Sequence, residues 1–405
     1  MERMQELFNE AEILRLGELR RRLHRYPEVS EHEHETARVV ERELRERSVP
    51  DRLITGLGSM GTGICALYEG RRPGPTVMLR CELDALPIQD LGLHEHRSEH
   101  DGVAHLCGHD GHMTTMIAVA HSLRQQPLEH GRAVLLFQPA EETGTGAAAL
   151  LEDQRFLELE PDLILGFHNL PTFPAGTVVA RAGTFAAASV GFVATFEGRT
   201  SHSSYPEYGL SPTSTVSQLL EFVNGLERQH EQSFIARSTG TVTSAALGAV
   251  ELGPNFGTAP GEAVVMGVLR AYHDQDLGKL KSLVSDKVRQ LAEAAELHSE
   301  LEWREEFAAT ENDAEVVEWL ESVAEAEGWQ YQRVEEPFRW SEDFGRYVTR
   351  FKGAFFGIGA GETQPQLHSN TYDYPDEIIP VGAGMYRTLL ERFTAGESST
   401  SDEHT

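Results

Sequence analysis

Apolar residues along this chain follow two patterns. Short continuous apolar runs, which are typical of buried strands, alternate with stretches in which apolar residues recur every three or four positions, as in amphipathic helices. This alternation predicts an α/β domain in the N-terminal half. Strands are expected at 63–68, 77–83, 133–138 and 163–167, with a helix over 111–125.

The pattern changes near Gly183 and changes back near residue 312. Between them, strand-like segments at 186–196, 240–248 and 263–272 are interleaved with helical segments at 212–227 and 276–297. Such a stretch describes a small α+β domain inserted into a larger α/β domain. We predict 1–185 and 306–393 for the larger domain, 186–305 for the insertion and 394–405 for a polar, disordered tail.

The second helix is expected to begin with a capping box. Ser30 and Glu33 have the Ser-x-x-Glu spacing of this motif, and the helix should end near Arg45. His32, Glu33 and His34 resemble a metal-binding cluster, but we interpret them as the solvated start of that helix.

Charge narrows the range of partners. The chain has 64 acidic and 35 basic residues, a formal charge of −29, which disfavours nucleic acids and anionic membranes. Glutamates interrupt the apolar positions of the N-terminal helix, so it is not a signal peptide, and no uncharged stretch is long enough to span a bilayer. We expect a cytoplasmic protein. The scarcity of lysine fits either adaptation to high salt or an ordinary acidic enzyme from a GC-rich genome.

Three cysteines are too few for a disulfide framework and fit a reducing compartment. Cys65 and Cys81 lie in apolar runs and are expected in the core. Cys107 instead stands one glycine away from His109, so both side chains can point at one place. Thiolates and imidazoles are ligands of zinc and related metals.

Two adjacent carboxylates follow the apolar run that ends near residue 138. One of Glu141 and Glu142 can hold a metal while the other moves protons. Together with Cys107 and His109 they predict a metal-dependent hydrolase. His112 lies one helical turn beyond His109, and either lining the pocket or packing in the core would explain it.

Several motifs, in order from residue 23 to residue 382, closely resemble the M20 metallopeptidase family. The resemblance is greatest to its amidohydrolase branch, which includes hippurate hydrolases, N-acyl-amino-acid amidohydrolases and auxin-conjugate hydrolases. The motifs are 23–28, 79–88, 105–112, 138–142, 166–168 and 368–369.

The resemblance implies a zinc-peptidase-like α/β catalytic domain interrupted by an α+β lid or dimerisation domain. It implies two divalent metal ions, with Glu141 as the general base. Cys107 and His109 would take one side of the pair and His168 and His368 the other, with a carboxylate or the thiolate bridging. The implied metal ligands are Cys107, His109, Glu142, His168 and His368. Taken alone, His168 reads as a core histidine.

Other residues are implied around the metals. Asp84 matches the second acidic residue of the family's Asp-x-Asp element and would support a ligating imidazole, although Glu82 replaces the first. The block 340–344 would supply further supporting carboxylates. His202 matches a histidine that steadies the developing oxyanion, in dimeric members from the partner subunit.

Asn255 and Arg270 stand where the family binds the substrate's carboxylate, although 252–260 departs from its usual Asn-Val-Ile-Pro wording. The expected reaction is hydrolysis of the amide bond of an N-acyl amino acid. A dipeptidase or carboxypeptidase using the same site, or a non-catalytic metal-binding protein, are the alternatives. Zn²⁺ or Mn²⁺ is expected, Co²⁺ and Ni²⁺ also fit, and a homodimer would form through the inserted domain.

Overall fold

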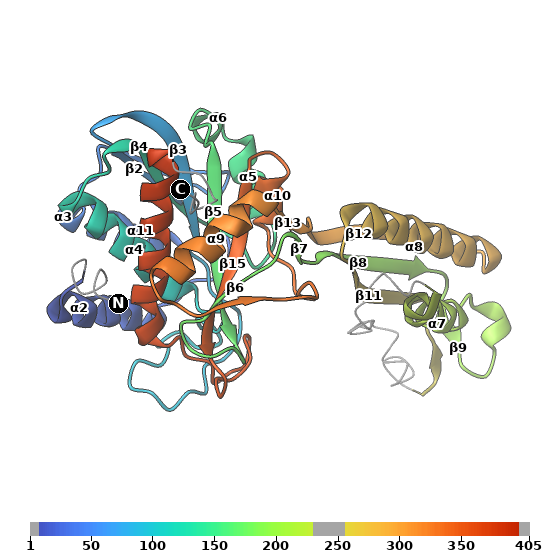
Figure 1. Ribbon diagram of the computed structural model, residues 1–405. Helices are drawn as coiled ribbons and strands as arrows, with labels where there is room; N and C mark the ends of the chain where they lie inside the picture. Colours follow the sequence, from blue (N-terminus) through green and yellow to red (C-terminus); the bar gives the residue numbers. More distant parts are fainter. Residues whose placement is uncertain (1–7, 230–255, 397–405) are drawn as a thin grey trace. The chain divides into compact units, whose positions relative to one another are not determined.

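The computed structural model describes residues 8–229 and 256–396. The chain forms two compact units (Figure 1). The larger comprises Met1–Phe185, Thr310–Pro337 and Asp343–Thr405, and the smaller comprises Ala186–Ala309 and Phe338–Glu342.

An eight-stranded mixed sheet, in the order β1-β2-β4-β3-β5-β15-β6-β14, forms the centre of the larger unit. Its four middle strands, β4, β3, β5 and β15, are parallel to one another. They are buried on both faces and therefore almost continuously apolar. The strands are β1 (Arg52–Leu57), β2 (Gly63–Glu69), β3 (Arg72–Glu82), β4 (His130–Gln138), β5 (Leu163–Pro171), β6 (Val178–Ala180), β14 (Tyr331–Arg333) and β15 (Gly353–Gly361).

Helices cover this sheet. α4 (His109–Gln125) and α11 (Ile379–Ala395) pack against each other and against β3, with α2 (Glu10–Arg25) and α3 (His34–Arg47) against α4 and α9 (Ala314–Ala326) against α11 (Figure 1). Phe167 and Phe356 contact Tyr386 of α11. Shorter helices contact one another near the same sheet: α5 (Gly146–Glu152), α6 (Gln154–Leu157) and α10 (Gly345–Val348).

The smaller unit has its own core. β8 (Ala188–Glu197) lies between β11 (Glu262–Ala271) and β12 (His298–Phe307) in an antiparallel sheet. α8 (Asp274–Ala294) packs on this sheet, and α7 (Thr213–Gln229) contacts α8 and β11. The short strands β9 (Ser201–His202) and β10 (Thr258–Ala259) pair with each other.

The α/β class with a second, α+β unit is confirmed, and the structure refines several details. The smaller unit extends past β12 to Ala309, and residues 338–342 also belong to it. α11 includes Thr394, which is buried, so the assignment of 394 and 395 to a disordered tail was wrong. The strand predicted at 240–248 lies outside the described residues. In the part of the chain that is described, no helix is long and apolar enough to cross a membrane.

Candidate active site

The predicted ligands meet at one edge of the large sheet. Because β3, β4, β5 and β15 are parallel, their carboxyl ends lie side by side, the usual location of sites in open α/β sheets. Asp84 follows β3, Glu141 and Glu142 follow β4, His168 lies near the end of β5, and His368 follows β15.

Gly108 makes the approach of Cys107 and His109 to this edge feasible. It caps the start of α4 with φ of 94°, a left-handed conformation that suits glycine. A Cβ at this position would lie 2.5 Å from Oδ1 of Asn169 on β5. The chain can therefore turn tightly between the thiol and the imidazole while packing against the next strand.

The ring of His109 is held in the orientation that a metal ligand needs. Its Nδ1 donates to the Asp84 carbonyl at 2.9 Å and lies 3.5 Å from the Asp84 carboxylate. Its Nε2 is buried without a hydrogen bond to any described residue and faces Glu141 Oε2 and Glu142 Oε1, each at 3.9 Å. Such a backed imidazole is typical of metal sites.

His168 is held in the same way. Its Nδ1 donates to the Asn169 carbonyl at 2.9 Å, and its Nε2 lies 3.3 Å from Cys107 Sγ. Burial lowers the pKa of His168 well below its usual value, with a further contribution from His112. A neutral imidazole with its lone pair toward a thiol is ready to bind a cation.

The backbone has an unusual conformation just before Glu141 and at His368. Ala140, just before Glu141, has φ of 51°, and His368 has φ of 63°, values that residues with a side chain seldom adopt. The His368 backbone N–H donates to Leu106 O at 2.9 Å, which holds this distant loop beside Cys107. His368 Nε2 lies 3.6 Å from Glu142 Oε2, and its side chain is 50% exposed.

These groups fit metal ions. Ligand atoms of Cys107, His109 and His168 lie within 4.8 Å of one another, and so do those of Cys107, Glu142 and His368. The sulfur is common to both groups, whereas the expected division placed His168 and His368 together. A thiolate, imidazoles and a carboxylate together are a donor set typical of zinc sites. One of the imidazole nitrogens, His109 Nε2, is buried without a hydrogen bond to a described residue.

Two supporting residues were misinterpreted in the sequence. α3 begins without a side-chain cap; instead, Ser30 donates to Asp84 Oδ2 at 2.7 Å, and buried Glu33 accepts the Ala140 N–H at 2.8 Å. Burial, together with the charge of Asp84, raises the pKa of Glu33 to about 7. Glu33 is therefore part of the site's scaffold rather than a solvated helix start. Nothing in its local sequence marks this role.

A buried ionic network lies beneath the ligands. Arg80 bonds to Glu82, to Asp343 at 2.6 Å and to Gln138 at 2.9 Å, and the Asp343 backbone N–H lies 3.4 Å from Glu141 Oε1. Asp343 thus has the supporting role that the resemblance implied for its block.

His112 is also buried in this layer. Its Nδ1 lies 2.6 Å from Glu82 Oε2 and its Nε2 lies 2.6 Å from Asn169 Oδ1. Both ring nitrogens are engaged, so the structure favours packing over pocket lining.

His202, expected to steady the oxyanion, and Arg270, expected to bind the substrate's carboxylate, belong to the smaller unit. His202 is exposed on β9, and its Nδ1 accepts the Ser204 N–H at 3.1 Å. Arg270, on β11, donates to Ser341 Oγ at 2.6 Å and to Arg339 O at 3.3 Å, and burial lowers its pKa. Asn255 lies outside the described residues.

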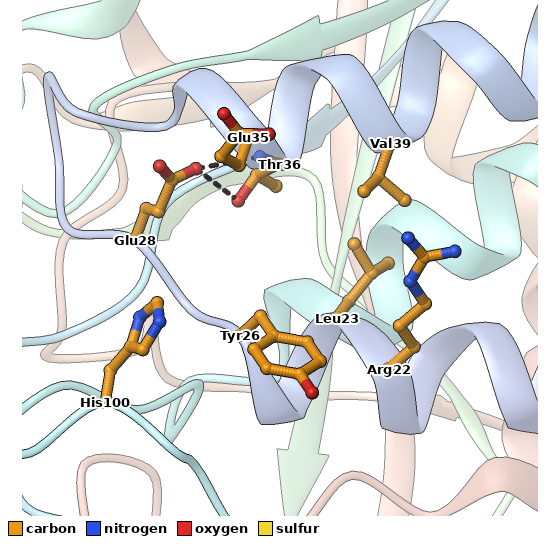
Figure 2. Close-up of a pocket in the computed structure, with 8 residues that line it drawn as sticks. All are labelled: Arg22, Leu23, Tyr26, Glu28, Glu35, Thr36, Val39 and His100. Atoms are coloured by element: carbon orange, nitrogen blue, oxygen red, sulfur yellow. Dashed lines mark hydrogen bonds between the residues drawn. The ribbon is translucent and has the colours of Figure 1, made fainter.

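A pocket of about 270 Å³ lies between α2 and α3 (Figure 2). Glu28 Oε2 accepts bonds there from the Thr36 backbone N–H at 2.7 Å and from the Thr36 hydroxyl at 2.9 Å. None of the predicted site residues lines it.

The fold and the ligand set together define a metal-dependent hydrolase built on an α/β sheet. Residues 78–392 match the model of peptidase family M20/M25/M40, and the chain belongs to this family. It is 30% identical over 385 residues to an N-acetyl-L-cysteine deacetylase of Bacillus subtilis, covering 94% of this chain and 89% of that protein. It is 28% identical to the IAA-amino acid hydrolase ILR1-like 4 of Arabidopsis thaliana, covering 95% and 88%.

Solved structures share the whole fold. A putative aminohydrolase from methicillin-resistant Staphylococcus aureus superposes with a TM-score of 0.81 at 24% identity, covering 96% of this chain and 98% of that one. A dinuclear metal-binding peptidase of the M20 family from Bacillus subtilis gives 0.77 at 24% identity, covering 96% and 99%.

Proposed function

We propose that this protein is a two-metal amidohydrolase that cleaves N-acyl amino acids into a carboxylic acid and a free amino acid. One observation carries the proposal: a thiol, three imidazoles and a carboxylate gather at the carboxyl edge of the sheet, with a second carboxylate beside them. The relatives named for deacetylation of N-acetylcysteine and hydrolysis of IAA-amino acids support this substrate class.

Two overlapping sets of residues would hold the metals. Cys107, His109 and His168 would form one and Cys107, Glu142 and His368 the other, with Cys107 common to both. When bound, divalent cations at such a pair supply Lewis acidity and lower the pKa of water to about 7. The thiolate favours Zn²⁺, while the imidazoles and carboxylate also admit Mn²⁺, Co²⁺ or Ni²⁺.

Glu141 is the proposed general base. Its Oε1 faces the Asp343 backbone N–H, and its Oε2 is directed toward His109 Nε2 at 3.9 Å. The carboxylate is thus oriented by the backbone on one side and presented to the ligands on the other. It would take a proton from the attacking water and return it to the leaving amine, because one group can serve as base and then as acid.

The smaller unit would contribute substrate recognition. We propose that Arg270 binds the substrate's carboxylate with Asn255, since a guanidinium is suited to forked pairing with a carboxylate. His202 would donate to the oxyanion, from a partner subunit if the protein is a dimer. We place the enzyme in the cytoplasm as a homodimer.

The test is release of free amine from a panel of N-acetyl and N-benzoyl amino acids, compared with free dipeptides, in the presence of Zn²⁺, Mn²⁺ or Co²⁺. N-acyl amino acids should be hydrolysed and activity should disappear after chelation. Full activity after exhaustive chelation would overturn the proposal, and preference for free dipeptides would reassign it to a dipeptidase.

The Glu141→Gln variant tests whether Glu141 acts as a general base or as a metal ligand. We expect turnover to fall by about 10²–10⁴-fold, because this is the usual contribution of a general base. Bound metal, measured by elemental analysis, should be unchanged. Glu142→Gln is the matched control and should lose metal as well as activity. A Glu141→Gln enzyme that retains its rate would contradict the assigned role.

A further inference from the structure

A second cluster of imidazoles and carboxylates lies in the larger unit, where the last turn of α2 meets the loop between β3 and α4. Ligand atoms of His24, Asp90 and His94 lie within 4.8 Å of one another. His24 and Asp90 are buried. None of the three belongs to the ligand set of the active site.

His24 is oriented like a metal ligand. Its Nδ1 lies 2.9 Å from Asp110 Oδ2, so one carboxylate backs the ring. Its Nε2 is fully buried, makes no hydrogen bond within the described chain and lies 3.4 Å from Asp90 Oδ2. In metal-binding histidines, a carboxylate commonly accepts a hydrogen bond from one ring nitrogen and so orients the other nitrogen toward the metal. His24 has this arrangement.

The loop holds the other two ligands in place. Asp90 accepts the Gly92 N–H at 2.8 Å and the Ser98 N–H at 2.9 Å, one on each oxygen. Nε2 of His94 lies 4.0 Å from Asp90 Oδ1, and neither ring nitrogen of His94 hydrogen-bonds to a described residue. Any Cβ at Gly92 would collide with His94 Nε2, so glycine is what allows the ring to lie there.

The dimensions suit a small cation. Zinc ligands lie about 2.0–2.2 Å from the ion, which places tetrahedral ligand atoms about 3.3–3.6 Å apart. The 3.4 Å between His24 Nε2 and Asp90 Oδ2 already matches, and the ligand atoms of all three residues lie within 4.8 Å of one another, so His94 completes the site by moving toward the other two. Two imidazoles and one carboxylate leave one position for water.

The surrounding charge favours a cation. Four carboxylates face two guanidinium groups, which leaves a net charge of −2 when the imidazoles are neutral. The six residues are Asp90, Asp110, Asp373, Asp376, Arg20 and Arg21.

The cluster is accessible to solvent through His94, and a neighbouring histidine, His96, holds the His94 ring in place. The side chain of His94 is 15% exposed, which provides a route from solvent. His96 stacks on His94 with ring centroids 4.1 Å apart, and its Nε2 lies 3.0 Å from Asp373 Oδ2. We assign His96 to positioning of the His94 ring.

We propose that His24, Asp90 and His94 bind one divalent transition-metal ion, best Zn²⁺, in addition to the metals of the active site. The ion would fasten the loop between β3 and α4 to α2. Through Asp110, which follows His109 in the first turn of α4, it would also stiffen the helix that carries an active-site imidazole.

A proton is the alternative occupant. Burial lowers the pKa of His24, but the Asp110 and Asp90 carboxylates outweigh it and raise the pKa to about 9. The cation must displace that proton, so binding should release protons, as is general for histidine sites.

Anomalous diffraction at the zinc edge, on crystals of the full chain equilibrated with micromolar Zn²⁺, tests the proposal directly. We expect a peak within bonding distance of His24 Nε2, Asp90 and His94 Nε2. Absence of that peak while the active site is filled, or a peak only at millimolar Zn²⁺, would overturn it.

Metal counting gives an independent test. His94→Ala should bind one Zn²⁺ per chain fewer than wild type and lose part of the Zn²⁺-dependent rise in melting temperature. His298→Ala, which removes an exposed histidine of the smaller unit, should match wild type. His94→Gln keeps a polar side chain should the alanine variant fold poorly. Equal zinc content in wild type and both His94 variants would refute the site.

Discussion

At the scale of single residues, Gly108 shows how backbone conformation fixes the ligands. Its φ of 94° and its contact with Asn169 both require the absence of a side chain. Gly108→Ala should destabilise the protein by more than the ~1–2 kcal/mol typical of a left-handed alanine, and should reduce metal content. Gly102→Ala is the matched control, because Gly102 has φ of 75° and open space around it. Equal effects of the two changes on stability and bound metal would contradict this account.

His105 makes a prediction about pH. It is buried, and neither ring nitrogen bonds to a described residue; burial lowers its pKa from 6.5 to about 3. Above pH 6.5 both states are neutral there, but below it the unfolded chain gains a proton that the folded one lacks. Stability should therefore fall with falling pH, by about 2 kcal/mol at pH 5 from this residue.

His105→Leu removes the group that takes up a proton in the unfolded chain and replaces it with an apolar side chain of similar size. Thermal unfolding of wild type and variant should be compared at pH 7 and pH 5. The variant should lose less stability between the two pH values. A parallel decline in both proteins would show that His105 does not carry the effect.

The residues that could be predicted are those whose chemistry is contiguous. Cys107 and His109 are separated by a single glycine, and Glu141 and Glu142 are adjacent and follow an apolar run, which makes both pairs recognisable. Glu33 could not be found, because its partner, the N–H of Ala140, is 107 positions away and its neighbours look like a solvated helix start.

At the scale of elements, β3 and α4 are joined by a buried charge network. Glu82 bonds to both Arg80 and His112. Glu82→Ala leaves a buried guanidinium short of a partner and should cost about 3–5 kcal/mol in the free energy of unfolding. Glu82→Gln keeps the shape and one acceptor, so it should cost less. Denaturant unfolding of both variants measures the difference, and equal stabilities would argue against the network's role.

At this scale, the sequence predicts strands that are buried on both faces and helices whose apolar residues recur regularly. The apolar middle strands β3, β4 and β5 were predicted, whereas β12 was not. β12 is an edge strand whose sequence, HSELEWREEF, alternates with charged residues and stays largely exposed. α11 was also missed, since Pro380, Gly382 and Gly384 lower helix propensity and tertiary packing compensates. At Gly382 a Cβ would lie 2.9 Å from Thr115 of α4.

At the scale of the whole molecule, the two units divide the proposed chemistry. The proposed metal ligands and Glu141 belong to the larger unit, and His202 and Arg270 to the smaller. The order of motifs along the chain was enough to predict this division, because an insertion leaves the flanking motifs in sequence. In the proposed homodimer, His202 could serve the active site of its own subunit or that of the partner, and no pattern along a single chain encodes which.

Subunit complementation decides this point. His202→Ala and Glu141→Gln homodimers should each be inactive, but a heterodimer would contain one site with an intact Glu141 and a partner that supplies His202. Because half of randomly mixed dimers are heterodimers with one such site, mixing should restore about a quarter of the wild-type rate. Differently tagged chains allow the heterodimer to be purified and its rate of amine release measured. If it stays inactive while light scattering confirms a dimer, His202 serves its own subunit, since no site in that heterodimer would then be complete.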